Sequence, residues 1–364
     1  MSSLELSAQR DIDGLYVDNT GTLYAAGTFR GFSVFKIEGN GDVSNAANGF
    51  SGPIHMTRST DGNLYVTNFN SASVSQVNQD GMVSTFASVL DGPSGIVSDA
   101  DGNLYVSHYG TGNGTGNSVS KIAPDGTVST FAMGGTLRAP VGIAIDPAGN
   151  IYTANLFDGR VTKITPDGTA SLFGEVAAAQ PFAIGHLVWA KDKLYGTYVG
   201  QSSVIAFDST GTSSVVAGTG TAGLNDGPAS NATFTSPNGL AASPSGDTLY
   251  VAQGLGATAK IRLVLLSTAT NIEEDASLET GALLQNYPNP FQNSTHIRYT
   301  MDTPAHVKLS VYDVLGREIK TLVDSQQAAG THEVAWHAED RAKGLYFYRL
   351  EAAGKTEVRS MLLQ

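Results

Sequence analysis

The chain has 364 residues, 42 of them glycine, and only 15 % are charged. This composition favours strands and turns over helices, since glycine supplies turns and Lys and Glu are depleted in strands. The absence of cysteine excludes disulfide scaffolds, cysteine nucleophiles and thiolate metal sites. No run of about 18 apolar residues occurs, so we expect no membrane-spanning helix.

The net charge of −12 arises entirely from the first part of the chain. Residues 1–284 hold 12 Lys and Arg against 24 Asp and Glu, whereas residues 285–364 hold nine of each. Nucleic acids and anionic membrane surfaces require clustered Lys and Arg. The acidic main part therefore argues against nucleic acid and membrane as partners.

Within residues 1–267, an aliphatic residue followed by tyrosine and preceded by a tight turn recurs six times. The six pairs begin at Leu23, Leu64, Leu104, Ile151, Leu194 and Leu249. Each repeat contains four short apolar or β-branched runs: a Pro-x-Gly segment starts the first, a Gly/Asn turn leads to the second, and Asp-Gly commonly joins the third to the fourth. A four-stranded sheet of this kind buries both faces only between neighbours in a ring. The pattern predicts an all-β, six-bladed β-propeller over residues 1–267.

Three repeats are especially complete: GPSGIVSDADGNLYVSH from Gly92, APVGIAIDPAGNIYTAN from Ala139 and SPNGLAASPSGDTLYVAQ from Ser236. Their pattern resembles NHL repeats over about residues 11–267. The resemblance implies a six-bladed propeller of the gluconolactonase-like and TolB-like superfamily. That superfamily contains both binding proteins and enzymes, so the fold alone does not decide the function.

The last repeat has a third strand at Ile261–Leu265 but only a poor fourth at 267–270. Leu4–Ser7 stands where a fourth strand would precede the first repeat. We therefore expect Leu4–Ser7 to complete the last blade and close the ring. The alternative is a frayed terminus without a partner.

Residues 268–284 hold clustered acids and no repeat, so we interpret them as a linker. Residues 285–364 alternate apolar and polar positions, which predicts a small, Ig-like antiparallel β-sandwich. This segment resembles the type A C-terminal sorting domain of the bacterial type IX secretion system. The resemblance rests on five ordered motifs, which include Asn286, Tyr287, Pro288, Asn289, Pro290, Phe291, Gly316, Arg317, Gly330 and Gly344.

The sorting resemblance implies an exported protein that is secreted or held at the cell surface, with the type IX machinery as a partner. Such cargo crosses the inner membrane by a leader peptide. The N-terminal sequence lacks a basic region and an apolar core. We expect that the sequence begins after its leader, or that the gene start is misplaced. We also expect a monomer.

One rim of the predicted propeller collects the polar residues that precede the first strands and follow the second strands. The candidate ligand-binding rim comprises Asp13, His55, Asn68, Ser94, His108, Asn155, Tyr198, Asn238 and Gln253. A binding face would need such groups. The alternative for each is that it merely hydrogen-bonds the neighbouring loops.

Asn238 lies in a segment similar to the one that holds a divalent metal in gluconolactonase-like enzymes. Ring closure would bring Asp13 beside it, but a hard cation takes about six oxygen ligands. Ile54, Val141 and Ile184 occupy the matching positions of other blades and offer none. We therefore predict no cofactor, keeping open a cation such as Ca²⁺ at Asp13 and Asn238.

The resemblance also suggests a second kind of catalysis, because virginiamycin-B-lyase-like propellers use a histidine and an acid to remove a proton. His55 and His108 are the candidate bases, whereas His186 and Trp189 are expected to pack between blades. Asp99–Asn103 resembles half of a calcium loop but is expected to be a β-turn.

No complete set of catalytic groups converges in the sequence, so the enzyme question stays open and leans towards no. The favoured function is an exported propeller that binds a glycan, a peptide or a small molecule. The alternative is a metal-dependent lactone hydrolase or a lyase on the same scaffold.

Overall fold

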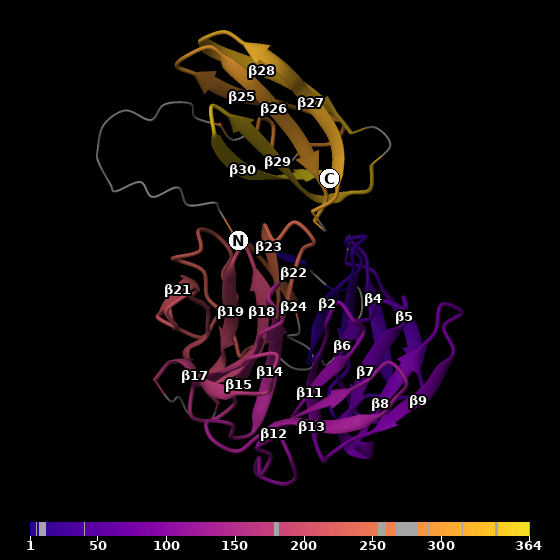
Figure 1. Cartoon of the computed structure of the whole chain (residues 1–364). Helices are drawn as coiled ribbons and strands as arrows, with labels where there is room; N and C mark the ends of the chain where they lie inside the picture. Colours follow the sequence, from indigo (N-terminus) through magenta and orange to yellow (C-terminus); the bar gives the residue numbers. More distant parts are fainter. Residues whose placement is uncertain are drawn as a thin grey trace. The chain divides into compact units, whose positions relative to one another are not determined.

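The computed structural model is all-β and divides into two compact units, Met1–Val264 and Leu265–Gln364. It describes residues 1–4, 6, 12–39, 41–177, 182–253, 260–266, 283–284, 286–289, 291–314, 316–338 and 341–363. Figure 1 labels the strands along the chain. In the described part, no helix is long and apolar enough to cross a membrane.

The described part of the first unit contains six four-stranded antiparallel sheets, the blades, each built mostly from consecutive strands. Blades 1 and 2 comprise β2 (Leu15–Val17), β3 (Leu23–Ala26), β4 (Ser33–Ile37) and β5 (Val43–Asn48), then β6 (Pro53–Arg58), β7 (Leu64–Asn68), β8 (Ser73–Val77) and β9 (Val83–Ser88). Blades 3 and 4 comprise β10 (Pro93–Ser98), β11 (Leu104–His108), β12 (Ser118–Ile122) and β13 (Val128–Met133), then β14 (Pro140–Ile145), β15 (Ile151–Asn155), β16 (Arg160–Ile164) and β17 (Ala170–Glu175).

Blades 5 and 6 complete the ring, with a short 3-10 turn after the second strand of blades 2 and 5 (η1, Phe69–Ser71; η2, Val199–Gln201). Blade 5 comprises β18 (Ile184–Ala190), β19 (Lys193–Tyr198), β20 (Ser203–Phe207) and β21 (Ser213–Ala217). Blade 6 comprises β22 (Pro237–Ala242), β23 (Thr248–Gln253), β24 (Lys260–Leu265) and, from the other end of the unit, β1 (Ser2–Leu4).

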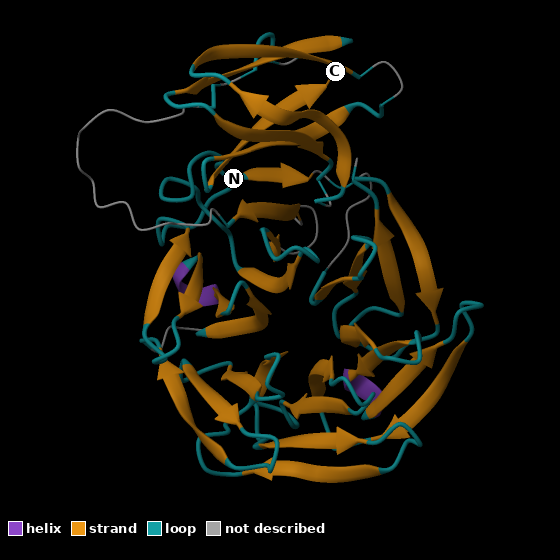
Figure 2. Cartoon of the chain, turned by 45° about the horizontal axis from the view of Figure 1, so that its top comes forward, coloured by secondary structure: helices purple, strands orange, loops and turns teal. Residues whose placement is uncertain are grey.

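The first strand of each blade contacts the first strand of the next, and β22 contacts β2 to complete the circle. Figure 2 shows the sheets arranged around a common axis. Burial falls from the inside outward: every residue of β7, β11 and β15 is buried, whereas the fourth strands β9 and β13 are exposed or half-buried apart from one buried alanine each. The predicted propeller is confirmed, and its core lies between successive blades.

The ring closes through the N-terminus, as the sequence predicted, although the strand lies earlier than expected. Strand β1 pairs antiparallel with β24, with Ser3 opposite Arg262 and Leu4 opposite Ile261. Leu4 is the side chain that this pairing buries. The predicted span Leu4–Ser7 overlaps the strand only at Leu4; positions 5 and 7, and the alternative strand at 267–270, lie outside the described residues.

Arg262 of β24 is fully buried and holds the closure together. Its guanidinium donates to Asp226 Oδ1 (3.1 Å from Nε and 2.8 Å from Nη2), to the carbonyls of Thr233 (2.7 Å) and Asn225 (2.8 Å), and to Gln253 Oε1 (3.2 Å). These contacts engage all five of its N–H donors. Asp226 also accepts from Ser3 Oγ at 3.0 Å, so one carboxylate ties β1, the 218–236 loop and β24 together.

The second unit pairs two sheets around an aromatic core. One sheet holds β25 (Ser294–Met301) and β28 (Gly330–His337); the other has the order β27 (Glu318–Gln327), β26 (Ala305–Tyr312), β29 (Gly344–Ala352), β30 (Lys355–Leu363). Trp336, Tyr299 and Tyr348 are buried between them, as a β-sandwich requires. Leu283 belongs to this core, whereas 268–282 of the predicted linker lies outside the described residues.

We predict that Arg262→Met lowers the melting temperature of the propeller by at least several degrees. The substitution keeps the apolar bulk but removes the donors that join β24 to the 218–236 loop and, through the exposed Asp226, to β1. Each hydrogen bond that involves a charged group contributes about 1.5–3 kcal/mol. Calorimetry of the full chain measures it. Arg160→Met, which removes only an exposed pair with Glu175, is the control and should change little. Equal midpoints for Arg262→Met and the wild type would show that the ring closes without the arginine.

Candidate functional site

The loops that join the second strand of a blade to the third, and the fourth to the next blade, lie on one face of the propeller. We call this face the rim. The opposite face carries the tight turns, in which Asp61, Asp99 and Asp146 each accept hydrogen bonds from a nearby Asn amide and Tyr hydroxyl. Asp99 also accepts from the backbone N–H of Asp101 and Asn103, which is the geometry of the turn expected there.

Four predicted rim residues are occupied in holding their own loops. Each ends a second strand and binds the loop 17 or 18 residues earlier: Asn68 to Ser51, His108 to Leu90, Asn155 to Arg138, and Gln253 to Thr235. The Tyr198 hydroxyl donates to the Ala177 carbonyl at 2.5 Å, and Ser94 is buried. In these residues the structure favours the alternative interpretation, in which polar side chains fix the rim loops.

The remaining predicted residues gather near the axis, together with a histidine that sequence reasoning had assigned to packing. Asn238 Nδ2 donates to Asp13 Oδ1 at 2.8 Å, and His186 Nε2 lies 3.2 Å from the same oxygen. The His55 ring lies 4.9 Å from the His186 ring, centroid to centroid. Blades 1, 6, 5 and 2 each contribute one member of this central cluster.

Small residues and strand-end hydroxyls position the cluster. A Cβ on Gly239 would lie 2.2 Å from the Asp13 carbonyl oxygen, so glycine permits the close approach of blades 6 and 1. Thr197 Oγ1 accepts from the His186 N–H (3.1 Å) and donates to the Asn238 carbonyl (2.7 Å). One hydroxyl thus sets the positions of both His186 and Asn238 around Asp13.

His55 and His108, the bases suggested by the sequence, are both buried as neutral rings. Burial, together with the nearby His186, lowers the pKa of His55 to about 3. Burial also lowers the pKa of His108 to about 4, and its ring bridges the Leu90 carbonyl and Ser120 Oγ. Such low pKa values make either ring a weak proton acceptor near neutral pH.

His186 is better placed than either, because it contacts the carboxylate of the cluster. Its Nδ1 is buried and has no hydrogen-bond partner among the described residues. The expected packing role holds for Trp189, which stacks on Tyr152 of blade 4 with ring centroids 5.4 Å apart. The available signal in the sequence was that His186 directly follows the glycine of its first-strand segment, where other blades have an apolar residue such as Ile96 or Leu240.

The adjacency of Asp13 and Asn238 agrees with the closure argument, while the cation considered for them stays a prediction. Within the described residues, no three His, Asp or Glu side chains gather in a way that could hold a metal ion. Ile54, Val141 and Ile184 are buried apolar side chains at the equivalent positions. Among the described acidic and amide side chains, the central cluster offers the Asp13 carboxylate and the Asn238 amide to a cation that takes about six oxygens.

A second feature of the rim escaped the sequence analysis. Phe69, Tyr109, Phe157 and Phe182 form an aromatic arc, with successive ring centroids 5.8, 6.1 and 5.9 Å apart. The first three follow the second strands of blades 2, 3 and 4 by one or two residues. That recurrence was the available signal, although only the ring geometry shows that the side chains meet.

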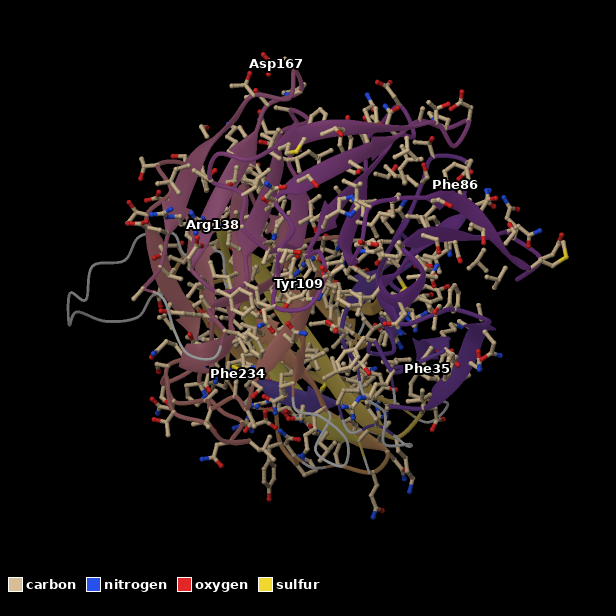
Figure 3. All side chains as sticks on the ribbon, turned by 90° about the horizontal axis from the view of Figure 1, so that it is seen from below. Phe35, Phe86, Tyr109, Arg138, Asp167 and Phe234 are labelled. Carbon is tan, nitrogen blue, oxygen red and sulfur yellow. The ribbon has the colours of Figure 1, made fainter. Side chains whose placement is uncertain are left out.

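The arc borders a polar hollow on blades 3 and 4. Two adjoining cavities of about 480 and 560 Å³ share Arg138 and Asp158, and Phe157 lines the first. Asp158 Oδ1 accepts from Asn155 Nδ2 at 3.0 Å, whereas the Arg138 guanidinium has no ion-pair partner in the described part of the chain. Figure 3 labels Tyr109 near the middle of the propeller and Arg138 nearer its edge in that view.

The glycine-rich loop predicted after β11 lies against the arc. A Cβ on Gly114 would stand 2.7 Å from the Phe157 ring and 3.1 Å from the Tyr109 ring, so only glycine allows this contact. The loop also lines the first cavity through residues 114–117. It therefore forms one wall of the hollow and supports two rings of the arc.

Two family models match the chain. The model of the virginiamycin B lyase family matches residues 27–261, nearly all of the propeller. The chain belongs to the virginiamycin B lyase family. A secretion system C-terminal sorting domain matches residues 285–364, which confirms the predicted sorting domain. The NHL repeat in particular stays a prediction for this member of the lyase family. No curated protein sequence matches the chain.

Solved structures similar to this lyase-family chain share its propeller fold at low sequence identity. An inactive variant of virginiamycin B lyase from Staphylococcus aureus, crystallised with quinupristin, is 14 % identical (TM-score 0.51; 82 % of this chain and 95 % of that chain). A gluconolactonase from Xanthomonas campestris is 14 % identical (TM-score 0.56; 72 % and 91 %). Regucalcin from Agrobacterium tumefaciens, a calcium-binding protein, is 13 % identical (TM-score 0.56; 73 % and 94 %). At these identities the likeness concerns the fold.

Proposed function

We propose that the protein is an exported binding propeller that takes an uncharged glycan on its rim. The sorting domain directs the chain to the cell surface or the surroundings, where polysaccharides are accessible. The observation that carries the proposal is the aromatic arc beside a polar hollow. Sugar rings present an apolar C–H face and a periphery of hydroxyls, so they require both kinds of surface at once.

The aromatic arc and the polar hollow have complementary roles in this proposal. Phe157, which lines the first cavity, and the neighbouring Tyr109 are the half-buried rings against which sugar rings stack in this proposal. Arg138 and Asp158, which line both cavities, offer planar donors and acceptors at the edge of those faces. The charge of residues 1–284 is −12, which disfavours strongly anionic polymers and leaves a neutral glycan as the better match.

We expect Tyr109→Ala to weaken binding of a soluble neutral polysaccharide at least tenfold, because it removes a stacking surface from the middle of the arc. Affinity electrophoresis of the full chain in gels that contain the polysaccharide measures retardation, and a panel of such polymers identifies the ligand. Leu172→Ala is the matched control, since Leu172 is an exposed apolar residue on the outer strand of blade 4. Equal retardation of Tyr109→Ala and the wild type, with both folded, would contradict the proposal.

A second candidate function is proton abstraction at the axis, and the contact between Asp13 and His186 favours it. In this account Asp13 orients the His186 ring, and the unpartnered Nδ1 accepts a proton from a substrate. The virginiamycin B lyase activity that gives the family its name and the lactonase activity of the Xanthomonas protein suggest the substrates to try.

If the propeller is an enzyme of this kind, the full chain converts quinupristin or gluconolactone, and His186→Gln abolishes the conversion. Mass spectrometry of the reaction mixture follows product formation. His332→Gln, in the second unit, is the control and should retain activity. Failure of the wild-type chain to convert either compound would leave the binding function as the better account.

A further inference from the structure

Tyr287 of the sorting domain is 81 % exposed, more than any other large apolar side chain in the described part of the chain. It belongs to the segment Asn286–Phe291, which opens the sorting domain. Large aromatic side chains contribute strongly to protein–protein contacts when a partner buries them. Full exposure of one such ring is therefore informative if its backbone is held in place.

The residues on either side of Tyr287 fix that backbone. Asn286 is buried: its N–H donates to the Tyr348 hydroxyl (2.8 Å), and its side-chain amide donates to Thr295 Oγ1 (2.8 Å) and the Pro288 carbonyl (3.1 Å). Thr295 Oγ1 in turn donates to the Pro288 carbonyl at 2.8 Å. These bonds tie the segment to the first strand of the sandwich.

The rest of the segment is attached to two strands. The backbone of Tyr287 exchanges both hydrogen bonds with His296 of β25, each 3.0 Å long. Asn289 Oδ1 accepts from the Leu362 N–H at 2.8 Å, and the buried Phe291 donates its N–H to the Leu362 carbonyl. The described neighbours of Tyr287 therefore serve the fold of the domain, while Tyr287 itself stays 81 % exposed.

The surface beside Tyr287 is polar and charged. On the outward face of β25 and β28, Glu333 bridges His296 (2.8 Å) and Arg298. A projecting aromatic ring next to a charged network has the composition of an interface anchor with its polar surround. It suits a protein partner with an apolar pocket, and it lacks the row of rings and the hollow that the glycan proposal requires.

We propose that Tyr287 is an anchor by which the type IX secretion machinery recognises this sorting domain. The partner is a protein component of that machinery, because handling by it is the role of a sorting domain. The Tyr287 ring enters a pocket of the partner, and the buried bonds of Asn286 and Asn289 present the ring in one fixed position. This inference is independent of what the propeller binds.

The test is export of the full chain, expressed behind a leader peptide in a type IX-competent bacterium. Immunoblots compare the amounts in the medium, at the cell surface and in the periplasm. Tyr287→Ala is expected to reduce export at least fivefold and to accumulate in the periplasm. Tyr287→Phe, which keeps the ring, should be exported normally. Val358→Ala removes another exposed apolar side chain of the same domain and should also be exported normally.

Thermal unfolding of the purified variants separates recognition from folding. We expect the melting temperature of Tyr287→Ala to equal that of the wild type, since the ring is exposed. Normal export of Tyr287→Ala would overturn the proposal. A loss of export accompanied by a large fall in melting temperature, or an equal loss in Tyr287→Phe, would overturn it as well.

Discussion

Closure of the ring by the N-terminal strand is the constraint on which the rest of the propeller depends. Strand β1 completes blade 6, and the buried Arg262 joins β24 to the 218–236 loop and, through Asp226, to β1. Only a closed ring brings Asp13 beside Asn238, 225 positions later, and beside His186, 173 positions later. The central cluster is thus a product of topology, because no local sequence contains it.

Hydrogen bonds between neighbouring blades explain why the buried inner strands of the propeller can carry polar side chains near its axis. The penultimate residue of a second strand bridges two blades: Thr67 donates to the Ser94 carbonyl (2.7 Å), Ser107 to the Val141 carbonyl (2.9 Å), and Thr197 to the Asn238 carbonyl (2.7 Å). Each bond satisfies a buried carbonyl that the neighbouring blade would otherwise leave unpaired. The same bonds set the spacing of the first strands, on which His186 and Asn238 lie.

The polar side chains on the two faces of the propeller have different roles. On the turn face, acids such as Asp99 and Asp146 accept hydrogen bonds from their own turns and from a Tyr hydroxyl of the same blade. On the rim, the strand-end side chains hold loops, but Arg138, Asp158 and Phe157 line space that a ligand could occupy. Binding chemistry is therefore concentrated where the loops vary most in length.

The fold could be predicted from the sequence because it repeats: the aliphatic–Tyr pair recurs once per blade, and Pro-x-Gly and Asp-Gly turns each recur in three of the six blades. The closing strand was predicted as well, but at Leu4–Ser7 and not at Ser2–Leu4. The register depends on the pairing of the buried Leu4 with Ile261, and the residues on either side of Leu4 do not reveal that partner. The candidate functional site was harder to predict from the sequence. The pairing of His186 with Asp13 and the meeting of Tyr109 with Phe157 are contacts between blades, and a single repeat does not encode the angle between two sheets.

The most direct test of the binding account is a crystal structure of the full chain soaked with an oligosaccharide of the polysaccharide that retards it most. The account predicts sugar density on Tyr109 and Phe157, with hydroxyls within hydrogen-bonding distance of Arg138 and Asp158. Sugar bound at the turn face, or at the outer edge of a blade with the hollow unchanged, would contradict it.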